Sequence, residues 1–195
     1  MKLPSITKAK DCFDKVADGF GLTCIESSEQ LLKYQNEFVS LTVALDRLRS
    51  FELSITLGGN GAQYPQESFS LAEILRFRGR QESDFLDGLM VVDEEGLSNI
   101  LPRVANLILI HAADFLSGNK ESYSQIQEWR NMECKKFELD SSLKYAREII
   151  EEAWKARDYE TIVNVLSPIK GGLTEFEIKR LEYALKHTGH TNSSS

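Results

Sequence analysis

Cysteine, histidine and proline are scarce in this chain of 195 residues, which has three Cys, three His and four Pro. The cysteines are odd in number and form no C-x-x-C pair, so they predict neither a disulfide framework nor a zinc site. No set of His, Cys, Asp and Glu shows the spacing of metal ligands, and we therefore expect no metal and no cofactor. Reduced thiols fit a cytoplasmic protein best. The cysteines are Cys12, Cys24 and Cys134.

An apolar run long enough to cross a membrane is also missing. The most apolar stretch, residues 93–116, is interrupted by polar side chains before it reaches the roughly 20 apolar residues that a bilayer needs. Asp93 is a suitable N-cap and Gly118 a suitable stop, so we expect a central helix that is buried on nearly every side from Val104 to Phe115. Residues 1–5 show no apolar signal core. The interrupting residues are Arg103, Asn106, His111 and Asp114.

No arrangement of residues points to catalysis or to phosphate binding. The glycine-rich loop 58–61 lacks the helix and the Lys-Ser/Thr pair of a phosphate cradle and is predicted to be a turn. His111, alone on the central helix beside Asp114, is expected to be a core residue. Glu94 and Glu95 diverge by about 100° on a helix and cannot share a substrate. We expect a protein that is not an enzyme.

Acidic residues are in excess, and the formal net charge is -7. Residues 1–100 hold 10 Lys and Arg against 16 Asp and Glu. An acidic surface repels the phosphate backbone, which argues against direct binding of nucleic acid, and it attracts a basic protein partner. Solubility alone is the competing explanation of the charge.

The first half of the chain predicts a helix packed on a small antiparallel sheet. Residues 5–20 form an amphipathic helical pattern, and residues 22–25 and 30–35 are candidate strands. Apolar residues alternate over 39–45 and again over 51–57, which predicts a hairpin with a five-residue loop at 46–50. Leu45 would then face Phe51, and the non-core face would be flat and small.

The second half predicts helices. Ser70 and Glu73 form a capping box that opens a short helix over 71–77 and displays Arg76, Arg78 and Arg80, a weak indication of an anion site. Further helices are expected over 121–138, with Phe137 inward, over 141–157, in a hairpin ending near Pro168, and over 174–187. The expected fold is α+β, with an N-terminal module at 1–90, a helical bundle built on the central helix at 91–188, and a disordered tail at 189–195.

Two resemblances extend this description. Residues 153–163, Ala-Trp-Lys-Ala-Arg-Asp-Tyr-Glu-Thr-Ile-Val, resemble the turn between the helices of a tetratricopeptide repeat, although no second copy follows. The order of an N-terminal helix, the segments 34–41 and 44–53, and the later helices resembles small bacterial proteins that include immunity proteins encoded beside secreted toxins. That resemblance implies a cytoplasmic protein that binds one toxin domain tightly and has no catalytic activity.

The partner-binding surface is predicted to be acidic, and the partner to be a protein such as a basic nuclease toxin. Glu82, Asp84 and Asp87 are expected to lie in a loop, where binding residues collect. Two alternatives stay open: a helical adaptor that binds a peptide through residues 153–185, and a hydrolase that brings His111 or the three arginines against a carboxylate. The candidate partner-binding residues are Asp46, Glu82, Asp84, Asp87, Glu94 and Glu95.

Overall fold

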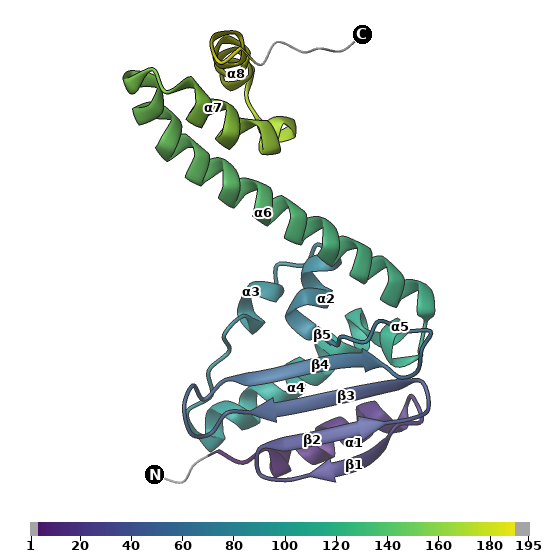
Figure 1. Cartoon of the computed structure of the whole chain (residues 1–195). Helices are drawn as coiled ribbons and strands as arrows, with labels where there is room; N and C mark the ends of the chain where they lie inside the picture. The colour runs from purple at the N-terminus through teal and green to yellow at the C-terminus, as the bar shows by residue number, and fades with distance from the viewer. Residues whose placement is uncertain (1–3, 190–195) are drawn as a thin grey trace. The chain divides into compact units, whose positions relative to one another are not determined.

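The computed structural model describes residues 4–189 and has the expected α+β class (Figure 1). It divides into two compact units, Met1–Trp129 and Arg130–Ser195. Each unit has its own apolar core. The expected boundary after residue 90 differs from the observed one, because the helices after residue 90 contribute core residues to the sheet-containing unit 1. The expected tail lies outside the described residues except for Gly189.

Unit 1 contains a five-stranded antiparallel sheet in the order β1-β2-β3-β4-β5. The predicted alternation is seen in β3, where apolar residues are buried and the residues between them are half-buried, because successive side chains of a strand point to opposite faces. The strands are β1 (Thr23–Ser27), β2 (Leu31–Gln35), β3 (Val39–Leu45), β4 (Leu53–Gly59) and β5 (Phe69–Ser70).

The register of the β3–β4 hairpin differs from the prediction by two residues. Leu45 pairs with Leu53, not with Phe51, so the connecting loop spans residues 46–52. Phe51 has a positive φ of 54°, and Glu52 forms an antiparallel bridge with Met90, so this part of the chain is held by a distant segment. Because side chains alternate with a period of two, a shift of two residues leaves every side chain on its predicted face.

One face of the sheet is covered by helices (Figure 1). A short 3-10 helix η1 (Ile6–Ala9) leads into α1 (Lys10–Asp18), whose apolar side is buried. The central helix α4 (Glu94–His111) begins at the predicted N-cap Asp93 and shares one core with the strands. It is followed by α5 (Ala113–Leu116).

The prediction that the central helix is covered on nearly every side is wrong. Leu109 is 46 % exposed and Ile110 is 60 % exposed. His111 is half-buried at the end of α4, not enclosed in the core. An apolar composition shows that a helix can be buried all round, but the number of covering elements decides how much of it is buried. No helix in the described residues 4–189 is long and apolar enough to cross a membrane.

Two short helices follow the sheet. The predicted capping box is present at α2 (Leu71–Phe77): the Ser70 side chain accepts the Glu73 N–H, and the Glu73 carboxylate accepts the Ser70 N–H. The next helix, α3 (Ser83–Leu86), occupies a segment that was expected to be a loop.

Helix α6 (Lys120–Ala156) is a single helix of 37 residues where two helices were predicted. Ile126 is buried in unit 1 and Ile150 in unit 2, and at roughly 100° per residue these two side chains point about 120° apart around the helix. The apolar stripe therefore changes face along α6, which explains why its phase was ambiguous in the sequence. Phe137 was predicted to point inward and is 73 % exposed.

Unit 2 contains the end of α6 and three further elements: α7 (Tyr159–Leu166), a 3-10 segment η2 (Ser167–Gly172), and α8 (Glu175–His187), which ends at the predicted residue. The Thr174–Glu177 capping box predicted for α8 is present. The Glu177 carboxylate also accepts the Arg147 Nε–H at 2.7 Å. Arg147 and the Thr174 N–H lower the pKa of Glu177 to about 2, against its burial.

Replacing Glu177 by Gln is expected to destabilise unit 2 by about 2 kcal/mol at neutral pH, because the charged hydrogen bond to a half-exposed Arg147 is lost. The folded pKa lies below the ordinary value of 4.5, so ionised Glu177 stabilises unit 2 fully above that pH and progressively less as the pH falls toward 2. Urea unfolding, followed by the fluorescence of Trp154 in a Trp129→Phe background, measures the loss of unfolding free energy. The exposed Glu148→Gln is the control, and equal midpoints for Glu177→Gln and the control at pH 7 would contradict the assignment.

Candidate protein-binding surface

The sheet face opposite α1 and α4 is turned toward the viewer in Figure 1. Where β3 and β4 pair, the residues on this face have small side chains. Thr42 pairs with Thr56 and Ala44 pairs with Ser54 across β3 and β4. Ser54 is exposed and the other three are half-buried. Short side chains leave the strand backbone accessible to a partner and lose little conformational entropy when they are covered.

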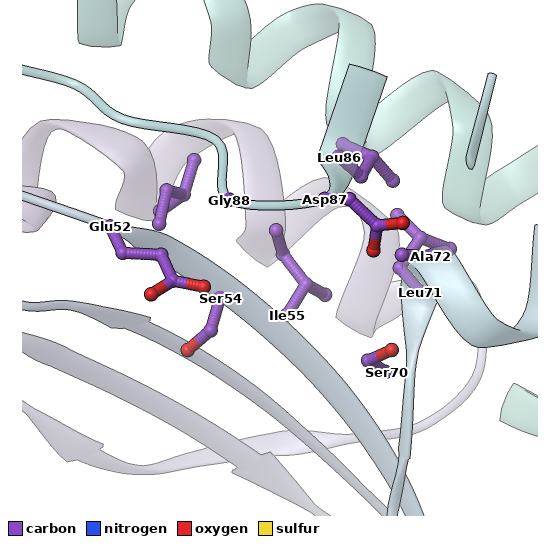
Figure 2. Close-up of a pocket in the computed structure, with 10 residues that line it drawn as sticks. Glu52, Ser54, Ile55, Ser70, Leu71, Ala72, Leu86, Asp87 and Gly88 are labelled. Carbon is purple, nitrogen blue, oxygen red and sulfur yellow. The ribbon is translucent and has the colours of Figure 1, made fainter. Parts of the chain in front are cut away.

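Two adjoining hollows, here called the acidic hollows, lie where β3 ends and β4 begins. The larger has a volume of about 520 Å³ and includes Asp46 and Ser50 in its lining. The smaller has a volume of about 100 Å³ and includes Asp87. Glu52 and Ser54 line both. Figure 2 shows Glu52 and Ser54 on one side of the smaller hollow and Asp87 on the other. Three carboxylates from two chain segments, the 46–52 loop and the residue after α3, thus line the two adjoining hollows.

Glu52 was not among the predicted binding residues. Its position is set by backbone hydrogen bonds on either side: the Val91 N–H donates to the Phe51 carbonyl at 2.7 Å, and the Leu53 N–H donates to the Leu89 carbonyl at 2.8 Å. These bonds hold the chain on the segment after α3 while the Glu52 side chain is exposed. The alternation of apolar residues over 51–57 already placed Glu52 on the non-core face. This alternation was the sequence signal that could have identified Glu52 as a surface residue.

Asp87 is in the smaller hollow but is not free. Arg76 at the end of α2 places Nη2 at 2.5 Å from each carboxylate oxygen of Asp87. Both side chains are about half exposed, so this ion pair is partly screened by water. Gly88 follows with a φ of +63°, which turns the chain out of α3 toward the bridge with Glu52.

Asp46 has a structural role that the sequence did not predict. Its carboxylate accepts the N–H groups of Leu48 at 3.1 Å, Arg49 at 3.0 Å and Ser50 at 3.3 Å. These bonds, that of the Leu48 N–H first, lower the pKa of Asp46. An aspartate that accepts several backbone N–H groups closes a turn, so Asp46 forms the loop that shapes the larger hollow.

The other four predicted residues lie outside the acidic hollows. Glu82 immediately precedes α3 and Asp84 is in its first turn, so these two acids belong to a helix end and not to a free loop. Glu94 accepts the Ser5 N–H at 2.9 Å, which gives it a part in holding the N-terminal segment. Glu95 is exposed in the first turn of α4, where a negative charge is favoured by the helix dipole.

Two of the three arginines that suggested an anion site, Arg76 and Arg78, are paired with carboxylates, whereas Arg80 is exposed. Arg76 binds Asp87, and Arg78 forms an ion pair with Asp114. Asp114 also accepts the Ser122 hydroxyl, so its recorded partners are Arg78 and Ser122 and do not include the nearby His111. Within the described part of the chain, no group of three or more His, Cys, Asp or Glu side chains could hold a metal ion.

Charge is divided unevenly between the two units. Residues 1–129 contain 12 Lys and Arg against 19 Asp and Glu, which leaves -7, whereas residues 130–195 contain 11 of each and are neutral. The whole net charge of the protein therefore belongs to the unit that bears the acidic hollows.

Comparison with known proteins adds no family: no protein-family model, curated protein or solved structure matches the chain.

Replacing Asp46 by Ala is expected to loosen the 46–52 loop, because three backbone N–H groups lose their acceptor. Amide hydrogen exchange of Leu48, Arg49 and Ser50 should accelerate and the melting temperature of unit 1 should fall. The folded pKa lies below its ordinary value of 3.8, so the native protein should show the same loosening as the pH falls below that value. Glu52→Gln is the matched control, and exchange rates as slow in Asp46→Ala as in Glu52→Gln would contradict this role.

Proposed function

We propose that this chain is a non-catalytic binding protein that inhibits a basic protein partner, as immunity proteins inhibit the toxins encoded beside them. The observation that carries the proposal is the confinement of the whole net charge of -7 to unit 1, the unit that bears the acidic hollows. The proposed partner is a toxin domain with a positively charged substrate groove, such as a nuclease, and the proposed location is the cytoplasm.

The physical basis of the inhibition is charge complementarity. A nuclease concentrates positive charge where it binds phosphates, so an acidic surface competes for the same groove and accelerates encounter through long-range attraction. The acidic hollows add shape to this attraction, because a concave region can receive a protruding basic side chain. Glu52 is the strongest candidate contact: it is exposed, it lines both hollows, and the structure records no hydrogen bond or ion pair for its carboxylate among the described residues.

A second proposal, the helical adaptor, is supported by aromatic side chains in unit 2. The rings of Trp154, Tyr159 and Tyr183 lie 5.5–6.2 Å apart in pairs, with Tyr183 44 % exposed. Phe176, 62 % exposed, lies 4.4 Å from the Arg180 guanidinium. Exposed aromatic residues beside an arginine resemble the composition of binding hot spots. A peptide bound here would not depend on the charge of unit 1.

One capture experiment separates the two proposals. The tagged chain is used to retrieve the product of the gene next to its own, at about 50 mM and about 300 mM NaCl, where screening lengths differ by more than twofold. Glu52→Lys combined with Glu82→Lys should reduce the association rate at least tenfold at the lower salt concentration and much less at the higher one, because long-range attraction is lost.

The control, Glu148→Lys combined with Glu182→Lys, makes the same charge change on exposed residues of unit 2 and should leave the rate near that of the native chain. Binding that is insensitive to salt and to both charge reversals, and is lost on Phe176→Ala with Tyr183→Ala, would replace the first proposal with the adaptor. Failure to retrieve the neighbouring product at either salt concentration would count against the immunity function.

A further inference from the structure

The middle of α6 differs from the rest of the helix in its surroundings. All seven residues from 132 to 138 are exposed, including Met132 at 63 % and Phe137 at 73 %. None of their side chains makes a hydrogen bond, an ion pair or a ring contact with any residue of the described chain. Earlier in α6, Tyr123 and Ile126 belong to the core of unit 1, and later Ala146 and Ile150 belong to that of unit 2.

The stability of this section therefore does not come from side-chain packing. Most helices in proteins are stabilised by packing of an apolar face, whereas residues 132–138 retain only their backbone hydrogen bonds and helix propensity. Opening the section exposes almost no additional apolar surface. The main free-energy cost of opening is the interruption of the helix, which lowers the population of the open form by a nucleation factor on the order of 10⁻³.

We propose that residues 132–138 of α6 are a local opening section: the helix opens and recloses there while the cores of both units stay folded. This inference is independent of the proposed function, because it rests on burial within α6 and not on the acidic hollows. When this section opens, proteases can reach its backbone, whereas the backbone of the two cores stays protected. The opened section contains Lys135 and Lys136, which are cleavage sites for trypsin.

Hydrogen exchange and limited proteolysis of the full native chain test the proposal. Amides of residues 132–138 should exchange with protection on the order of 10³ or less, and those of residues 123–126 should be protected more strongly, because they need unfolding of unit 1. Brief trypsin treatment should cut first at Lys135 or Lys136 among the internal sites of a chain with 23 Lys and Arg. Equal protection of the two segments, or first cleavage elsewhere, would overturn the proposal.

A pair of variants separates local opening from unfolding of a whole unit. Glu133→Gly with Glu138→Gly should speed exchange of residues 132–138 by about 30-fold relative to Glu133→Ala with Glu138→Ala, because two glycines favour the open backbone. Exchange in residues 123–126 should be unchanged between the two variants. If exchange of residues 123–126 accelerates by the same factor, opening requires unfolding of unit 1 and the proposal fails.

Discussion

The burial of one face of the sheet is the interaction on which unit 1 depends. Val39, Leu41 and Val43 of β3 have no exposed surface, and they share a core with Val104 and Ile108 of α4. Because alternate residues of a strand point to opposite faces, fixing this core also fixes which side chains face outward. The small polar face of β3 and β4 follows from that burial, whereas the smaller hollow lies where the start of β4 meets residues of α2 and α3.

The acidic residues of unit 1 fall into two groups that composition alone does not separate. Asp46 closes a loop, Asp93 caps α4 by accepting the Gly96 N–H, and Glu94 accepts the Ser5 N–H. Asp87 is paired with Arg76. Glu52, in contrast, is exposed at the point where both hollows meet. A net negative charge therefore results partly from local backbone requirements and partly from side chains available to a partner, and only the second group can be altered without affecting the fold.

Local chemistry in the sequence predicted local structure well. The capping boxes at Ser70 and Thr174 were both found, because every group in them lies within three residues. The hairpin register was missed, because it depends on the distant bridge between Glu52 and Met90. The continuity of α6 was missed because two cores use different sides of it. For the candidate surface, two of the six predicted residues, Asp46 and Asp87, line the acidic hollows; Glu52 was missed because an outward acid on a strand looks like ordinary solvation.

Asp46 forms the loop and Glu52 is exposed beside it, and this difference has an evolutionary consequence. Because Asp46 shapes the loop, selection for folding removes most replacements at this position. Replacements at Glu52 do not affect folding in this way. Related chains are then expected to keep Asp46 and to vary at Glu52. For the proposed inhibitor, this arrangement would allow specificity to change while stability stays constant.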